Sequence, residues 1–282
     1  MSGIAAYTRP QTVDAALASL ATGNSQILAG GTDFYPALGE RVVQQPVVDI
    51  SALTELRGIT RKGSHFRIGA LTTWTDVIHA ALPPCFDALK SAAREVGSVQ
   101  IQNRGTVAGN LCNASPAADG VPPLLILDAE IELLSHTSHR QIPLHDFLVG
   151  NRKTKRRPDE LLTAILIPNA PVNARSAFLK LGARRYLVIS ISMVAAALVF
   201  GEDDRVSVAR VAVGSCSAVA RRLPQLERDL IGIRRIDPGH PVNAEHLSDL
   251  SPIDDVRATA AYRVDATTHL IQRALAQCGG RP

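Results

Sequence analysis

Apolar positions in the first hundred residues switch repeatedly between helical and extended spacing. Residues 12–21 carry apolar side chains at helical spacing behind Thr12, a possible N-cap, and predict a helix. Short apolar runs bounded by turn residues predict strands over 27–29, 47–50 and 65–70. Further helices are expected over 34–38, 73–81 and 88–96. Strands that alternate with helices are typical of an α/β or α+β fold.

The order of elements changes in the second half of the chain. A helix over 116–127 and strands over 129–134 and 161–167 come first. Pro168 and Pro171 then interrupt the pattern, which predicts a domain boundary near residue 170. Beyond it the sequence predicts strands over 177–181, 189–200 and 205–213, followed by helices over 218–230, 244–250 and 256–277. Strands followed by helices favour a separate α+β domain.

Two glycine-rich segments interrupt these elements. In the first, the apolar run at 27–29 leads into Gly30-Gly31 and then into Thr32-Asp33, a good helix start. The second, residues 101–119, is rich in Gly, Asn and Ser, which disfavour the interiors of helices and strands. We therefore expect 101–119 to be a loop that lies against a polar ligand.

The residue types of both segments suit the diphosphate of a dinucleotide. Glycines let the main chain approach closely, and successive N–H groups near a helix start can donate to two negative charges. Asp119 could accept from two neighbouring ribose hydroxyls. Each residue also has a structural interpretation, since the glycines can form turns and Asp33 and Asp119 can lie at helix N-termini. The chain has neither a Gly-x-Gly-x-x-Gly nor a Walker-type motif, which disfavours a Rossmann or P-loop site.

The order and spacing of these segments resemble those of the FAD-binding medium subunit of the molybdenum hydroxylases, the xanthine dehydrogenase and carbon monoxide dehydrogenase family. The resemblance rests on residues 29–33, 103–110 and 113–119 and extends more loosely over most of the 282 residues. Ala108 stands where the family usually has a second glycine, and Cys112 where a small residue is usual.

The resemblance implies an α+β fold in two domains. Residues 1–170 would form a two-part FAD-binding domain of the PCMH type, with small α/β subdomains of about 1–55 and 56–170. Residues 171–282 would form a C-terminal α+β domain, like that of the carbon monoxide dehydrogenase flavoprotein, with a three-stranded antiparallel sheet and helices.

The same resemblance implies which residues hold FAD. Both glycine-rich segments would wrap the diphosphate and adenosine, Leu162 would pack on the adenine, and Lys180 and Tyr186 would lie near the flavin ring. Leu162 can equally be core, and 180–189 an ordinary basic turn. No catalytic side chain and no metal ligand is predicted, because the flavin ring itself carries the redox chemistry. The predicted FAD-binding residues are Leu28, Ala29, Gly30, Gly31, Thr32, Asp33, Thr106, Gly109, Asn110, Asn113, Ser115, Asp119, Leu162, Lys180 and Tyr186.

Composition excludes several other classes of function. A net charge of +4 and 4% aromatic residues argue against nucleic acid as the main partner. The four cysteines are scattered, so neither an iron–sulfur cluster nor structural zinc is expected in this chain. Scattered thiols and short apolar runs predict a cytoplasmic protein without a membrane partner. We expect the basic run 152–157 to be a solvated loop.

The sequence thus predicts an FAD-binding electron-transfer subunit of a multi-subunit molybdenum hydroxylase. The resemblance implies a molybdopterin-binding large subunit and a [2Fe–2S] small subunit as partners, with NAD, oxygen or another electron acceptor. Two alternatives stay open. One is a self-contained FAD-dependent oxidoreductase of the same fold, similar to the enolpyruvyl-sugar reductases. The other is a non-enzymatic nucleotide-binding subunit of an assembly.

Overall fold

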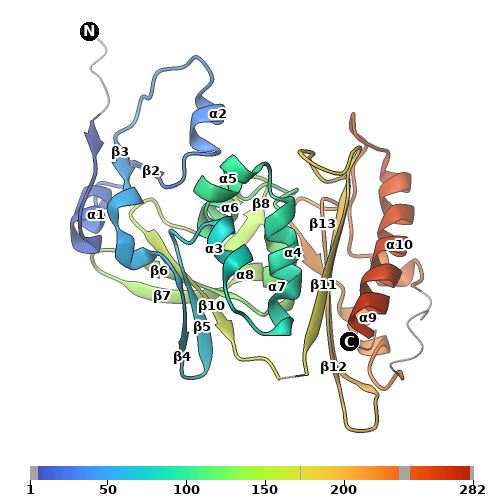
Figure 1. Ribbon diagram of the computed structural model, residues 1–282. Helices are drawn as coiled ribbons and strands as arrows, with labels where there is room; N and C mark the ends of the chain where they lie inside the picture. Colours follow the sequence, from blue (N-terminus) through green and yellow to red (C-terminus); the bar gives the residue numbers. More distant parts are fainter. Residues whose placement is uncertain (1–5, 172, 235–241, 280–282) are drawn as a thin grey trace.

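The computed structural model describes residues 6–171, 173–234 and 242–279 (Figure 1). Three larger sheets and one two-stranded hairpin are present in these residues. The first sheet is parallel and has the order β1 (Tyr7–Thr8), β3 (Val47–Asp49), β2 (Gln26–Leu28). Helix α1 (Val13–Leu20) follows β1, and the Thr12 side chain accepts a hydrogen bond from the N–H of Ala15, as predicted for its cap. Helix α2 (Phe34–Leu38) follows the first glycine-rich segment.

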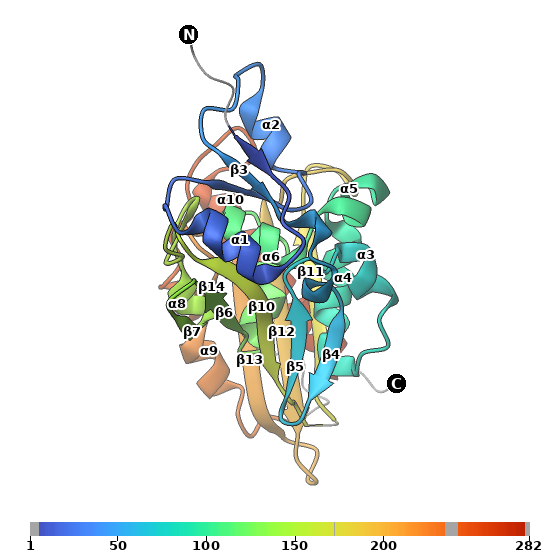
Figure 2. The same cartoon turned by 90° about the vertical axis from the view of Figure 1, so that its left-hand side faces the viewer.

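The second sheet is antiparallel and has β10 (Leu161–Pro168) at its centre. Every residue of β10 except Pro168 is buried, as expected for a strand covered on both faces. In Figure 2 this sheet lies in front of β12 and β13, which belong to the third sheet. The order of strands is β4 (Ile59–Lys62), β5 (His65–Gly69), β10, β6 (Glu130–Leu134) and β7 (His139–Pro143).

A layer of helices separates the second sheet from the third (Figure 1). Their apolar faces form one continuous core with the second sheet and with one face of the third. Helix α3 begins with a complete capping box between Thr73 and Asp76, which fixes its start. The helices of this region are α3 (Trp74–His79), α4 (Asp87–Glu95), α5 (Val99–Arg104), α6 (Val107–Asn113), α7 (Val121–Ile126) and α8 (Leu144–Phe147), and the small β8 (Leu148–Gly150)–β9 (Lys153–Thr154) hairpin follows them.

The third sheet is antiparallel, with one strand more than the three predicted. Its order is β11 (Arg175–Leu181), β12 (Ser192–Phe200), β13 (Val206–Gly214), β14 (Arg221–Arg222). The helix expected over 218–230 is wrong at its start: β14 occupies this stretch, and α9 (Pro224–Asp229) begins only at Pro224, because proline is tolerated at a first helical position but not inside a helix. Residues 244–250 contain only a 3₁₀ turn, Glu245–Leu247, while α10 (Ala260–Gly279) covers the outer face of the sheet (Figure 1).

The prediction that 101–119 forms a loop is wrong for most of its length. Helices α5 and α6 occupy residues 99–104 and 107–113, and a turn connects them to α7. Local signals still define α6, because Thr106 accepts from the N–H of Gly109 at its start and Ala114 ends it in the left-handed region. The buried face of α6 is apolar, and this burial outweighs the weak helix propensity of its Gly and Asn residues.

Within the described ranges, no helix combines the length and the apolar character needed to traverse a lipid bilayer. The same residues contain no cluster of three or more His, Cys, Asp or Glu side chains able to hold a metal ion.

Glu160 anchors the end of the hairpin to β10. Its carboxylate is buried and accepts hydrogen bonds from Nε and Nη2 of Arg140, at 2.7 and 2.8 Å, and from the N–H of Arg157, at 2.7 Å. Burial alone would raise the pKa of Glu160, but the hydrogen bonds and charges of Arg140 and Arg157 outweigh it and lower that pKa below its usual value.

We expect Glu160→Gln to lower the free energy of unfolding at neutral pH by about 1.5–3 kcal/mol, because it removes charge-assisted hydrogen bonds. The lowered pKa means that this stabilisation is present above the ordinary pKa of Glu and is lost as pH falls through the lowered value. Urea unfolding at neutral and acidic pH measures the difference, which should shrink in acid. Glu130→Gln, at an exposed position, is the control. An equal effect of both substitutions would contradict the prediction.

Candidate cofactor-binding site

The two glycine-rich segments lie in direct contact. A Cβ atom on Gly30 would lie 1.9 Å from the main-chain oxygen of Arg104, and one on Gly105 would lie 3.2 Å from the Thr32 hydroxyl. Gly31 has φ at +77°, a conformation that suits glycine. Because the glycines have no side chains, the turn at 30–31 can pack directly against the α5–α6 connection.

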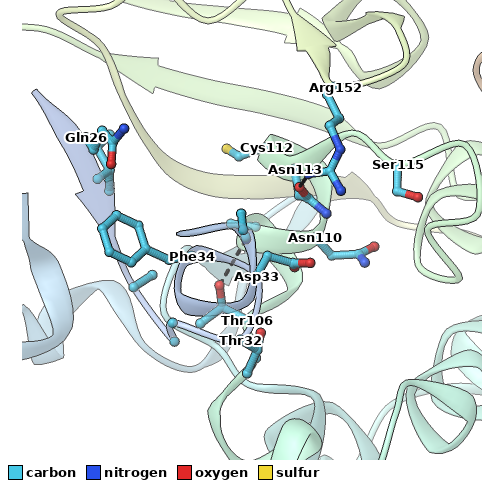
Figure 3. A pocket seen from close by; sticks show the side chains of 18 of the residues that line it. Gln26, Thr32, Asp33, Phe34, Thr106, Asn110, Cys112, Asn113, Ser115 and Arg152 are labelled. Atoms are coloured by element: carbon cyan, nitrogen blue, oxygen red, sulfur yellow. Dashed lines mark hydrogen bonds between the residues drawn. The ribbon is translucent and has the colours of Figure 1, made fainter. Parts of the chain in front are cut away.

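Both segments line one cavity of about 1720 Å³, part of which Figure 3 shows from close by. Residues of β10 and β11 and residues 187–189 also line it. Sites for drug-sized ligands typically measure about 300–1,000 Å³, so this cavity suits a larger, extended ligand.

Asn110 leaves an unpaired polar atom in this cavity. Its Oδ1 is buried and has no hydrogen-bond partner among the described residues. A buried oxygen without a donor is costly, so the atom points to a ligand that carries hydroxyl or N–H groups. A nucleotide with ribose or sugar-alcohol hydroxyls offers such donors.

A buried ion pair forms part of the cavity wall. Lys180 Nζ lies 2.6 Å from Asp119 Oδ2, and the Ser190 hydroxyl donates to Asp119 Oδ1 at 2.7 Å. Both charged side chains are less than a tenth exposed. Burial raises the pKa of the Asp119 carboxyl, and the Lys180 ammonium and the Ser190 hydroxyl oppose that rise. Both oxygens of Asp119 already accept one hydrogen bond, so the predicted contact with ribose hydroxyls would use their remaining lone pairs.

The structure brings most of the predicted FAD-binding residues together. Leu28 does not line the cavity, because this end of β2 turns its side chain into the core. Tyr186 does not line it either: its side chain is exposed, with the Arg185 guanidinium 5.3 Å from its ring centroid, and Leu187, Val188 and Ile189 line the cavity instead. The predicted residues that do line it are Ala29, Gly30, Gly31, Thr32, Asp33, Thr106, Gly109, Asn110, Asn113, Ser115, Asp119, Leu162 and Lys180.

Sequence reasoning missed two kinds of cavity residue. One is an apolar wall that includes Trp74, Val96 and Ile101. The other comprises Arg152 and Arg156. The run 152–157 is mostly exposed, as expected for a solvated loop, but these two side chains also line the cavity. Both arginines are far in sequence from the glycine-rich segments, so no local pattern indicated that they line the cavity. Only the fold around the β8–β9 hairpin brings them to it.

This site defines a class of protein: an α+β protein with a large cavity that two glycine-rich segments line, and that can hold a dinucleotide without a Rossmann fold. Comparison with known proteins narrows the class. Residues 2–170 match the FAD binding domain in molybdopterin dehydrogenase, and residues 177–278 match the CO dehydrogenase flavoprotein C-terminal domain.

Whole-chain relatives agree with these matches. The chain is 31% identical to the putative xanthine dehydrogenase FAD-binding subunit of Escherichia coli K12, over 100% of this chain and 99% of the relative. It is 28% identical to the nicotine 6-hydroxylase medium subunit of Paenarthrobacter nicotinovorans, over 98% and 97%. Among solved structures, a chain of the reconstituted CO dehydrogenase from Oligotropha carboxidovorans superposes with a TM-score of 0.91 at 24% identity, over all of both chains.

The chain belongs to the FAD-binding medium subunits of the molybdenum hydroxylase family. Its cofactor is FAD, and the unpaired Asn110 oxygen, the glycine turns and the apolar wall all fit that cofactor.

Proposed function

We propose that this chain holds FAD in the cavity and passes electrons from the [2Fe–2S] clusters of a small subunit to NAD, oxygen or another acceptor. A molybdopterin-binding large subunit would complete the assembly. The names of relatives support an assembly, since they include a medium subunit and, in Paenarthrobacter nicotinovorans, a subunit of a 6-hydroxypseudooxynicotine dehydrogenase complex. The observation that carries the proposal is the single cavity shared by both glycine-rich segments.

Bound FAD supplies the electron-accepting ring. The chain supplies the rest. Gly31 and Thr32 line the cavity, where their main-chain N–H groups would donate to the diphosphate, and Asn110 Oδ1 would accept from a hydroxyl. Leu162 offers an apolar surface for the adenine. Lys180, paired with Asp119 in the cavity wall, would present an N–H donor to the flavin, on which reduction places negative charge.

We also propose that the chain divides at residue 170, into 1–170 and 171–282. The two family matches, which end at 170 and begin at 177, support this division. The first two sheets would form the subdomains of about 1–55 and 56–170, and the third sheet the C-terminal domain.

FAD binding can be followed through Trp74, the single tryptophan of the chain and a residue of the cavity wall. We expect FAD to quench its fluorescence in a saturable way, because the ring system enters the cavity that Trp74 lines. ADP should bind more weakly than FAD, since it lacks the flavin. A folded chain whose Trp74 emission does not respond, and which retains no FAD on gel filtration, would refute the proposed site.

The electron path needs the purified complex. Reduction of the [2Fe–2S] partner should be followed by reduction of the bound flavin, and rapid mixing with NAD or with oxygen identifies the acceptor. Flavin that stays oxidised in a complex with reduced clusters would contradict the relay and leave FAD binding untouched.

A further inference from the structure

Arg152 enters the cavity from a part of the chain that no glycine-rich motif covers. It lies in the turn of the β8–β9 hairpin, with φ at +55°. Its main-chain N–H donates to the carbonyl oxygen of Ala114 at 2.8 Å, which fixes the hairpin against the end of α6. Its side chain reaches toward Asn113 (Figure 3), where Nη1 donates to Oδ1 at 2.7 Å.

This hydrogen bond determines what the pair offers to a ligand. The hydrogen bond from the guanidinium to Asn113 Oδ1 orients the amide of Asn113, whose two N–H donors remain for a ligand. The guanidinium of Arg152 has five N–H donors in total and no acceptor. Donors together with a full positive charge suit an anion with several oxygens better than a hydroxyl or a base edge.

The other cationic side chains that line the cavity form hydrogen bonds or an ion pair with other protein groups. Arg41 donates to the carbonyl oxygens of Ala37 and Leu38, and Arg156 donates to main-chain carbonyls that include that of Glu160. Lys180 is paired with Asp119. Of these four side chains, Arg152 and Lys180 bond to residues of the 101–119 segment. Lys180 faces a carboxylate there, whereas Arg152 faces the neutral amide of Asn113.

We propose that Arg152 supplies the full positive charge that binds the diphosphate of the cofactor, and that it holds Asn113 in place to donate alongside it. The inference rests on the proposed function, because it concerns the same cavity. Main-chain N–H groups carry only partial charges, so a guanidinium adds a full positive charge and charge-assisted hydrogen bonds to a dianion.

Binding of FAD, ADP and adenosine to Arg152→Gln tests the inference by calorimetry. The Kd for FAD and for ADP should rise about tenfold to a hundredfold, as expected for loss of a charged hydrogen bond. Adenosine, which lacks phosphate, should bind as it does to the unchanged chain. The salt dependence of ADP binding should also become weaker, and Arg152→Lys should recover part of the ADP affinity.

Arg157→Gln is the matched control, because it makes the same change in the same basic run at a side chain that is 60% exposed and outside the cavity lining. It should leave all three affinities unchanged. Equal weakening of ADP and adenosine by Arg152→Gln would show that Arg152 only shapes the loop, and an unchanged ADP affinity would show that it makes no phosphate contact; either result overturns the inference. Failure of the folded, unsubstituted chain to bind FAD would overturn the proposed function as well.

Discussion

Gly30→Ala is expected to raise the Kd for FAD at least about a hundredfold, a cost of about 2.7 kcal/mol. The new methyl group would lie 1.9 Å from the main-chain oxygen of Arg104, far inside contact distance. Because the obstacle is main chain rather than a flexible side chain, the two glycine-rich segments must move apart. Once the segments are separated, they can no longer both contact the diphosphate. Trp74 fluorescence titration measures the Kd, and thermal unfolding measures the accompanying loss of stability.

Gly150→Ala is the control for this substitution. The nearest atoms to a Cβ on Gly150 are side-chain carbons of Lys153 at 3.8 Å, an ordinary contact, and Gly150 lies outside the cavity lining. FAD affinity should be unchanged in this variant. If Gly30→Ala bound FAD as tightly as Gly150→Ala, the contact between the two segments would not be needed for the site.

Lys180→Met is expected to lower the free energy of unfolding of the FAD-free chain by about 3–5 kcal/mol. The substitution removes the cation that lies 2.6 Å from Asp119 and leaves a buried carboxylate that accepts a hydrogen bond from the Ser190 hydroxyl. Urea unfolding of the FAD-free chain measures this loss without a contribution from the cofactor. The deficit should shrink as pH falls, because a protonated Asp119 is cheaper to bury and its pKa is already raised by burial.

Two further variants distinguish the effect of breaking a buried ion pair from the effect of removing any charged side chain. Asp119→Leu combined with Lys180→Met should recover part of the lost stability, since neither charge then remains buried alone. Lys155→Met breaks an ion pair with Asp146 in which both side chains are about half exposed, and should cost less than about 1 kcal/mol. A loss of less than 1 kcal/mol in Lys180→Met would show that the carboxylate finds other partners.

The buried pair also shows where sequence reasoning reached its limit. Asp119 and Lys180 were both predicted to lie near FAD, and both line the cavity. Their mutual ion pair was not predicted, because 61 residues separate them. Only the packing of the third sheet, with β11 against α4 and with β12 and β13 against α7, brings them together. Tyr186 shows the opposite case: it stands next to residues that line the cavity, but its own side chain points elsewhere.

Local sequence by itself determined the elements that depend on short-range signals. Thr12, Thr73 and Thr106 each accept a main-chain hydrogen bond at a helix start, and the apolar runs became buried strands. The resemblance of the two glycine-rich segments was enough to identify the family and its cofactor. These features are encoded within a few residues, because caps, turns and periodic burial act over that range.

Only the tertiary structure decided the conformation of residues 107–113 and which residues outside the two glycine-rich segments line the cavity. Burial of the apolar face of α6 turned an expected loop into a helix, and the main-chain bond between Arg152 and Ala114 turned a basic run into part of the cavity wall. Both outcomes depend on contacts between residues about forty positions apart or more. Such contacts arise from packing and hydrogen bonding across elements, which a local pattern does not record.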